Sequence, residues 1–271
     1  MKKIFAAIIS GVMLAAAFGC SSAVNNEPKL NIADYSSSFK GVKGCAVFYN
    51  YNDSTYDFYN EEECSIRYSP NSTFKIVATL EGLKYGVAES ESSVMHYNGQ
   101  KYPFKSWEKN LNLKEAFQNS CVWYYRQLID GVGQENIAAD LKKINYGNCD
   151  VSQWKGSGAG PTEDTNGFWL GSSLEISPVE MVNVIADIFE GKTEYDDAHI
   201  SILKNIMESE VTGVYGKTGT GRDNSAWYSG FYEDNGGNIY FAVHLDNKDG
   251  KSIAGADAKA IACDIIEGYY R

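Results

Sequence analysis

A serine and a lysine stand three residues apart in the stretch YSPNSTFKIVATL, residues 68–80. Apolar residues recur at helical spacing from Ser72 to Tyr85, so the pattern predicts a helix there. At positions i and i+3 of a helix, Ser72 and Lys75 share one face and lie within reach of each other.

This spacing suits acid–base or nucleophilic chemistry. Ser72 falls in the first turn, where backbone N–H groups and the helix dipole favour developing negative charge. Apolar surroundings lower the pKa of a lysine by up to about 3–5 units from its reference near 10.4, so Lys75 could act as a neutral base or nucleophile. An isolated pair of this kind is more often a helix cap beside a lysine whose ammonium reaches solvent.

Two later motifs also carry chemically active side chains. SCV, residues 120–122, places the hydroxyl of Ser120 one residue before an apolar helix. KTGT, residues 217–220, places the cation of Lys217 and a close-approach glycine on an expected strand. The histidines lie far apart without ligand spacing, so we expect no metal site: His96, His199 and His244.

The elements that must position these side chains are strands at both ends of the globular part and helices between them. Residues 45–60 alternate around an Asn-Asp turn, which indicates a β-hairpin. Helices are expected over 113–129, 134–144, 177–191, 198–207 and 254–270, and strands over 213–220, 225–233 and 238–246. We predict an α+β fold of two lobes, with an antiparallel sheet from about residues 41–65 and 212–271, flanked by helices, and a helical lobe from about residues 86–205.

The first residues have the pattern of an export signal, with two lysines, an apolar run from Ile4 to Gly19, and then small residues. The run is shorter than the roughly 20 residues that span a bilayer. It resembles a bacterial lipoprotein signal, residues 1–19, after which Cys20 would be lipidated; cleavage after Ala23 is the alternative. Residues 20–40 are polar and small and are interpreted as a tether. We expect an exported protein, periplasmic or at the cell surface, whose only membrane contact is a lipid anchor.

Composition agrees with a folded, acidic, exported domain. The 271 residues are 44% hydrophobic and 13% aromatic, enough for one large domain or two close lobes. The net charge of −11 argues against a nucleic-acid or anionic-membrane surface. Export permits disulfides, and we expect one between Cys45, which opens a strand, and Cys64, which closes the next. Alternatively, the cysteines other than Cys20 are small buried hydrophobes.

The motifs in their order resemble those of the serine penicillin-recognising enzymes, and in detail those of the class D β-lactamases, the oxacillinases. They are STFK (72–75), SCV, YGN (146–148), Trp154, FWLGSSLEISPVEMV (168–182), and KTGT followed by AWYSGFYE (226–233). The resemblance covers about residue 41 to the C-terminus. It implies a β-lactamase/transpeptidase-like fold and a β-lactam small molecule as the partner.

The resemblance implies a role for each matching residue. Ser72 would attack the β-lactam carbonyl and form an acyl-enzyme. Lys75 would react with CO2 to form a carbamate, which would serve as the general base; no other cofactor is expected. Ser120 would pass the proton to the departing lactam nitrogen, and Lys217 would polarise that nitrogen.

The resemblance also implies the walls of the site. The backbone N–H groups of Ser72 and Thr220 would form the oxyanion hole. The carbamate would lie among Phe74, Val122 and Trp154. Many family members bind the substrate carboxylate with an arginine near the start of the last helix, but this chain has Ala258 at the corresponding place. Substrate contacts are therefore expected from Thr218, Gly219, Thr220 and Arg222, with Lys251 as an alternative.

Three functions stay open. The first is a class D β-lactamase that hydrolyses penicillins and related antibiotics. The second is a penicillin-binding sensor or D,D-peptidase-like protein that is acylated but deacylates slowly. A sensor normally carries further membrane segments, and these residues show none, which favours the hydrolase. The third, a catalytically silent surface lipoprotein, disagrees with the intact set of polar residues. The sequence leaves monomer and dimer both open.

Overall fold

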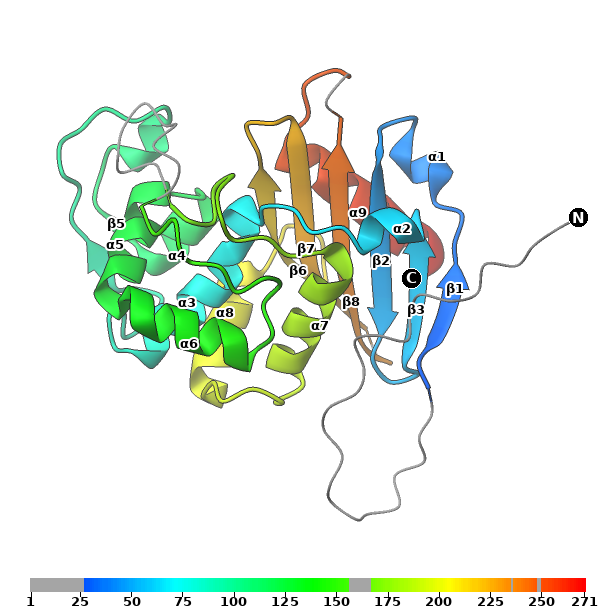
Figure 1. The fold of residues 1–271 in the computed structure, drawn as a ribbon, viewed down its shortest axis with the longest axis horizontal. Coiled ribbons are helices and arrows are strands. Elements are labelled where there is room, and N and C mark those ends of the chain that lie inside the picture. The colour runs from blue at the N-terminus through cyan, green and yellow to red at the C-terminus, as the bar shows by residue number, and fades with distance from the viewer. Residues whose placement is uncertain (1–26, 156–166, 235, 248–249) are drawn as a thin grey trace, which may run out of the picture.

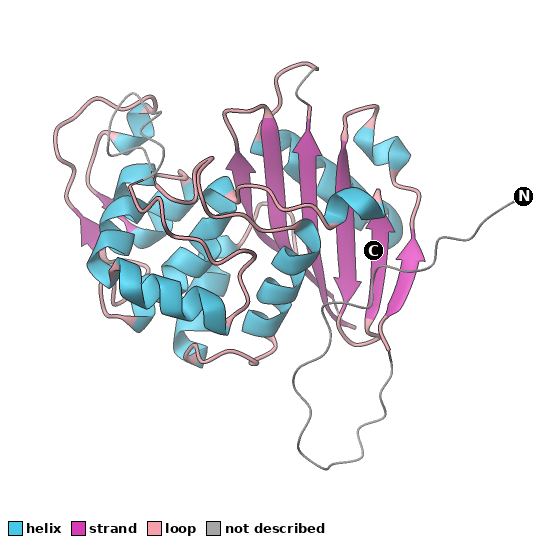
Figure 2. Ribbon diagram, viewed as in Figure 1, coloured by secondary structure: helices cyan, strands magenta, loops and turns pink. Residues whose placement is uncertain are grey.

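The computed structural model of the chain describes residues 27–155, 167–234, 236–247 and 250–271. The expected signal, residues 1–19, and Cys20 lie outside the described residues. Figure 1 shows a sheet with a lobe of helices on one side and the long helix α9 (Gly255–Tyr269) across its other face. Figure 2 shows that most of the described strands gather in one large sheet while helices dominate the lobe.

The sheet has six strands in the order β1-β3-β2-β8-β7-β6. Two come from the first hairpin and three from the last third of the chain, so both ends build it as predicted. Their bounds are β1 Lys29–Ile32, β2 Gly44–Asn50, β3 Thr55–Tyr59, β6 Val214–Thr220, β7 Ser225–Asp234 and β8 Gly237–Asp246. The fold is α+β, and it matches the predicted class.

One prediction about the sheet is wrong. Strand β1 runs parallel to β3, with Lys29 opposite Thr55, so the sheet is mixed and not wholly antiparallel. Strand β1 and the short helix α1 (Ser36–Phe39) also lie inside residues 20–40, which were interpreted as a tether. Aromatic anchors fold this polar segment: Tyr35 and Phe39 are both 1% exposed, and Phe39 stacks on Tyr59 with ring centroids 4.4 Å apart.

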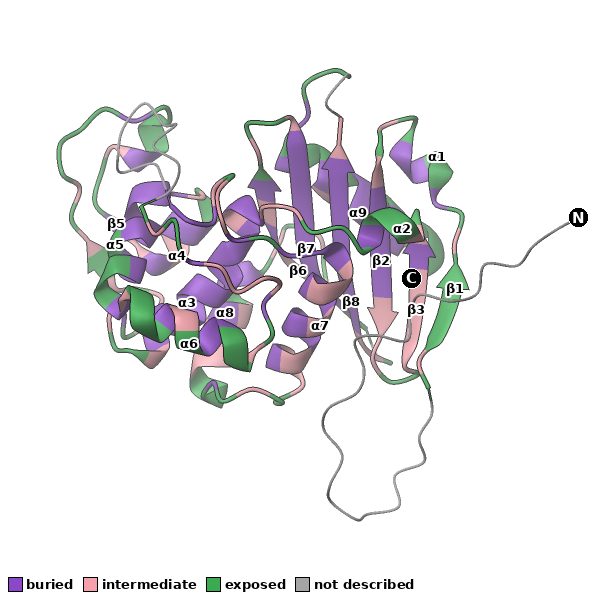
Figure 3. Ribbon diagram, viewed as in Figure 1, coloured by how far each residue is buried: buried purple, intermediate pink, exposed green. Residues whose placement is uncertain are grey.

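The helical lobe fills the middle of the chain, as predicted. Its elements are η1 Asn71–Phe74, α3 Lys75–Lys84, η2 Lys105–Trp107, α4 Leu113–Gln118, α5 Val122–Val132, α6 Gln134–Lys143, α7 Pro178–Phe189 and α8 Asp197–Met207, with a small ribbon of β4 Val94–Met95 and β5 Leu111–Asn112. The short helix α2 (Glu61–Cys64) packs beside β2. One apolar core lies between the lobe and the sheet, and a second lies between the sheet and α9. Figure 3 shows burial concentrated along the central strands and α3.

Cys45 and Cys64 are buried thiols and not a crosslink. Among the described residues every cysteine is free, and the predicted bond between Cys45 and Cys64 is not formed. Cys64 ends α2 and not a strand. Its Sγ donates to the carbonyl of Ala46 at 3.4 Å, and a hydrogen bond with the Cys45 thiol and then burial raise its pKa. The two side chains are therefore neighbours that behave as small buried hydrophobes.

Neither a membrane-spanning helix nor a metal centre is found among the described residues. None of their helices combines the length and the apolar character needed to cross a membrane. Nor do their histidines, cysteines and carboxylates form a cluster of three or more that could hold a metal ion.

Helix α3 carries a buried carboxyl in its second half. Glu81 is completely buried and accepts a hydrogen bond from the Tyr195 hydroxyl. Burial raises its pKa to about 7. Because the folded state holds this proton more tightly than the unfolded chain does, the stabilising contribution is complete below about pH 4.5 and is lost as the pH rises through 7.

We therefore expect Glu81→Gln to stabilise the protein at alkaline pH. At about 1.4 kcal/mol per pKa unit, the free energy of unfolding at pH 8 should rise by up to about 3 kcal/mol, with little change at pH 4. Urea unfolding of both proteins between pH 4 and 8 measures the difference. A difference that does not vary with pH would contradict an ionisation of Glu81 in this range.

Candidate active site

The nucleophile candidate and its lysine meet at the junction of two helices. Ser72 lies in the 3-10 helix η1, and Lys75 is the first residue of α3, so the predicted helix over 72–85 is divided in two. The Nζ atom of Lys75 donates to Oγ of Ser72 at 2.8 Å. The i, i+3 spacing in the sequence thus becomes a direct contact.

Lys75 is 0% exposed, and burial and the Cys121 thiol, with no carboxylate, are the influences on its pKa. Burial lowers its pKa to about 7, and the Cys121 thiol opposes this slightly. Its Nζ lies 5.3 Å from the ring centroid of Tyr125 on α5. A large fraction of this amine is therefore neutral at neutral pH.

Strand β6 brings the KTGT motif against the nucleophile. It is the edge strand of the sheet, and η1 packs on it. A Cβ at Gly219 would lie 3.2 Å from the Pro70 carbonyl oxygen and 3.4 Å from the Ser72 backbone nitrogen. A larger residue would push the strand away from Ser72, which explains the glycine.

Lys217 shares this face of β6, two residues before Gly219, and is 4% exposed. Burial, and then the charge of Lys75, hold its pKa well below the usual range. Its Nζ donates to the Thr218 carbonyl at 3.0 Å and lies 5.5 Å from the ring centroid of Phe117. Two buried lysines therefore converge on one region.

The backbone of β6 also offers a donor beside Ser72. The Gly221 N–H donates to the Ser225 carbonyl of β7 at 2.8 Å. Because successive N–H groups of an antiparallel strand point in opposite directions, the N–H of Thr220 points away from β7, toward the edge that η1 covers. This geometry fits an oxyanion hole made by Thr220 and Ser72.

Ser120 occupies a tight bend between α4 and α5. Its φ of 54° is in the left-handed region, and its N–H donates to the Phe117 carbonyl at 3.0 Å. The next residue, Cys121, acts on the pKa of Lys75, and Phe117 lies under Lys217. The bend therefore lies beside both lysines, although no direct hydrogen bond joins Ser120 to either Lys75 or Lys217 in this structure.

Aromatic rings form the wall beside Lys75. Phe74 is 0% exposed and packs edge-on against Phe168 at 5.2 Å and Tyr146 at 5.7 Å. Trp154 stacks on Phe168, with centroids 5.1 Å apart and planes 7° apart. Trp154 thus reaches the lysine region through two rings. Val122, 8% exposed, opens α5 directly after Cys121.

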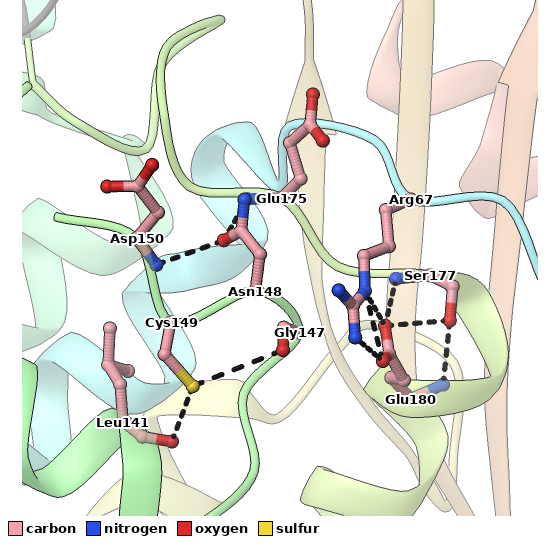
Figure 4. A network of polar contacts seen from close by, with 9 residues as sticks. All are labelled: Arg67, Leu141, Gly147, Asn148, Cys149, Asp150, Glu175, Ser177 and Glu180. Carbon is pink, nitrogen blue, oxygen red and sulfur yellow. Dashed lines mark hydrogen bonds and ion pairs between the residues drawn. The ribbon is translucent and has the colours of Figure 1, made fainter. Parts of the chain in front are cut away.

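Two networks fix, respectively, the segment before Ser72 and the loop of the YGN motif (Figure 4). Arg67 donates to both carboxylate oxygens of Glu180, which also completes the capping box of α7 with Ser177. Asn148 of the YGN motif accepts from the Glu175 N–H at 3.0 Å and the Asp150 N–H at 3.0 Å. The polar residues of the YGN and FWLGSSLEISPVEMV motifs therefore serve to hold loops in position.

The candidates for carboxylate binding lie at one end of β6. Ala258 is completely buried in the core under α9, so a side chain there faces the core and not the site. Gly255 lies closer, since its N–H donates to Thr220 Oγ1 at 2.9 Å. Arg222 is exposed in the turn after β6, and Asn224 in that turn donates to the Lys251 carbonyl at 3.3 Å. Both cations therefore belong to the same rim.

The penicillin binding protein transpeptidase domain model matches residues 12–267. The chain belongs to this family. Its relatives have two different functions. It is 32% identical over 243 residues to the regulatory protein BlaR1 of Bacillus licheniformis, covering 86% of this chain and 38% of that protein. It is 30% identical to the probable beta-lactamase YbxI of Bacillus subtilis, covering 96% of this chain and 92% of that protein.

A solved structure also matches: the class D beta-lactamase of Bacillus subtilis, with a TM-score of 0.78 and 30% identity over 88% of this chain and 96% of that chain. This likeness confirms the predicted fold within the penicillin-recognising family. The chain spans about two fifths of the length of BlaR1.

Several residues that line the candidate site carry no motif in the sequence. Tyr125 and Arg126 on α5 contact Lys75 and Trp154 respectively. They follow Val122 by three and four residues, so the helical period could have placed them on its face. Ser69 was also missed; its carbonyl accepts from Trp227 Nε1 at 3.0 Å, and its Oγ donates to the Trp169 carbonyl at 3.0 Å.

Proposed function

We propose that this protein is a class D β-lactamase that hydrolyses the β-lactam amide through an acyl-enzyme on Ser72. The observation that carries the proposal is the contact of a completely buried Lys75 with Ser72 Oγ at 2.8 Å. Because its pKa is lowered to about 7, Lys75 can react with CO2 as a neutral amine, and the resulting carbamate would take the proton of Ser72 as its oxygen attacks the lactam carbonyl. The N–H groups of Ser72 and Thr220 would stabilise the oxyanion.

The remaining residues complete acyl transfer. Opening the lactam ring leaves a nitrogen that needs a proton, and Ser120, in the bend beside Lys75, would pass on to it the proton that leaves Ser72. Lys217 would polarise the lactam nitrogen and keep it close to the Ser120 hydroxyl. Thr218, Gly219 and Arg222 would contact the rest of the substrate along β6 and its turn.

The surroundings of Lys75 fit a covalent CO2 adduct. Only a neutral amine can attack CO2, and burial lowers the pKa of Lys75 to about 7. A carbamate on Lys75, enclosed by Phe74, Val122 and, one layer further out, the ring of Trp154 stacked on Phe168, would supply a general base for deacylation. Water would then release the acyl group from Ser72, which separates a hydrolase from a penicillin trap.

A second candidate function is a penicillin sensor that is acylated once and deacylates slowly. The 32% identity to the regulatory protein BlaR1 favours it. The 30% identity to the probable beta-lactamase YbxI, over 92% of that protein, favours the hydrolase.

Turnover of a chromogenic cephalosporin by the purified protein separates the two. A hydrolase should release many equivalents of product per protein, while mass spectrometry shows only a transient acyl adduct. Release of one equivalent with a persistent adduct would establish the sensor. Absence of both adduct and product would overturn both functions.

We further propose that Cys20 is a lipid attachment site. It follows the apolar run and small residues of the N-terminal segment. Metabolic labelling with a palmitate analogue should tag the full-length protein, and Cys20→Ala should lose the tag and release the protein from membranes. An untagged, soluble wild-type protein would instead support cleavage after Ala23.

A further inference from the structure

Arg126 is an arginine inside the helical lobe, only 6% exposed. It lies on α5, one turn after the segment that carries Ser120 and Val122. Its Nη1 donates to the Trp154 carbonyl at 2.7 Å, and its Cζ lies 6.0 Å from the centroid of the indole ring. Its Nε pairs with Asp130 at 3.2 Å, one turn further along α5. The Arg126 side chain therefore contacts both the backbone and the ring of Trp154.

The contact between Arg126 and Trp154 matters because Trp154 belongs to a chain of packed rings that leads to Lys75. The indole stacks on Phe168, and Phe168 packs against Phe74, the neighbour of Lys75. Trp154 itself comes from the segment that follows the YGN motif and is only half-buried. A half-buried ring in a loop needs a partner from a rigid element to stay in one position. Helix α5 supplies that partner through Arg126.

Stability alone accounts poorly for this residue. A buried guanidinium loses its hydration, and an ion pair with one carboxylate repays that loss only in part. Within the part of the chain that the structure describes, Nη2 of Arg126 also lacks a hydrogen-bond partner. An apolar side chain of similar length would fill the space without these costs. The planar guanidinium, however, can stack and donate at once, which a lysine or a methionine cannot do.

We infer that Arg126 is a positioning residue that holds Trp154 against Phe168 and so keeps the aromatic wall beside Lys75 closed to water. The inference rests on the proposed function, because a dry wall matters only where Lys75 must be neutral. Without Arg126 the indole would move, and water would reach the ammonium of Lys75. Restored solvation would raise the pKa of Lys75 and reduce the neutral amine that reacts with CO2.

The test compares Arg126→Met and Arg126→Lys with Asp130→Asn, a matched control that removes the ion-pair partner but keeps both contacts to Trp154. The first readout is the carbamate signal in ¹³C NMR with ¹³C-bicarbonate; the second is the rate of acyl-enzyme decay. In both Arg126 variants we expect the bicarbonate concentration at half-maximal signal to rise about tenfold for each pKa unit that Lys75 regains. Deacylation should fall in parallel and recover with added bicarbonate, while Asp130→Asn behaves as wild type.

Stoichiometric labelling of Ser72 by a fluorescent penicillin reports the folded fraction, and Arg126→Lys serves if Arg126→Met does not fold. A double-mutant cycle then tests whether Arg126 acts on Lys75 through Trp154. If Arg126 acts through Trp154, Arg126→Met should cause no further loss in a Trp154→Ala background. Full additivity of the two losses, or unchanged bicarbonate dependence in both Arg126 variants, would overturn the inference. Absence of any carbamate signal from the wild-type protein would instead overturn the proposed base.

Discussion

Replacing Ser72 by alanine should abolish covalent labelling by a fluorescent penicillin and reduce β-lactam turnover to background. The change removes only Oγ, the atom that Lys75 contacts at 2.8 Å. The fold should survive, since one hydrogen bond is typically worth about 0.5–1.5 kcal/mol. Gel fluorescence measures the labelling, and thermal unfolding of the same sample measures the fold.

Ser120→Ala is the matched control for this experiment. It removes a second hydroxyl of the site, but the nucleophile and its lysine stay in place. Labelling should therefore persist at a lower rate. Stoichiometric labelling of Ser72→Ala would refute the assignment of Ser72 as nucleophile, and the labelled peptide would identify the residue that replaces it.

Lys75→Met should slow the reaction of the site and at the same time stabilise the protein. Methionine fills the same buried space without an amine, so the general base is lost, and general bases contribute typically 10²–10⁴-fold to rate. Deacylation should slow by about that factor, as seen in the lifetime of the acyl-enzyme by mass spectrometry. The same variant should unfold at a higher temperature than wild type near pH 7.

The stability difference has a definite pH dependence. The pKa of Lys75 is lowered to about 7 in the folded protein, whereas the unfolded chain keeps an ordinary lysine. The unfolded state therefore binds a proton that the folded state lacks, and wild-type stability falls as the pH drops from about 10.5 toward 7. Lys75→Met should show a smaller fall, because the lowered pKa of Lys217 still contributes one. If the stability of both proteins changed by the same amount between pH 7 and pH 10, a neutral Lys75 would be contradicted.

Helices and strands with a clear hydrophobic period could be predicted from the sequence, and elements without one could not. Helix α7 was predicted because Ser177, Pro178 and Glu180 form a complete start signal before an apolar run. Strand β1 was missed because it has only four residues and all are exposed, so its short alternation of polar and apolar residues buries no face. It exists because β3 offers an edge to pair with, and aromatic residues further along anchor the segment.

The residues of the candidate site likewise fall into those that motifs predict and those that only the folded chain brings together. The motif order predicted that Ser72, Lys75 and Lys217 act at one site, and the structure brings the three side chains near one another, while their catalytic roles stay predictions. Arg126 was missed because a lone arginine on an amphipathic helix is usually a solvated residue. Its contact with Trp154 is tertiary and joins residues 28 positions apart. Such contacts appear only when the lobe is assembled.

The most direct test of the central claim is deacylation by the wild-type protein after verified removal of CO2. If the base of Lys75 forms reversibly from CO2, penicillin should then give a rapid first turnover followed by a slow phase, and added bicarbonate should restore the fast second phase. Rates that are the same with and without bicarbonate would mean that Lys75 acts as a free amine, which would contradict the class D mechanism proposed for this chain.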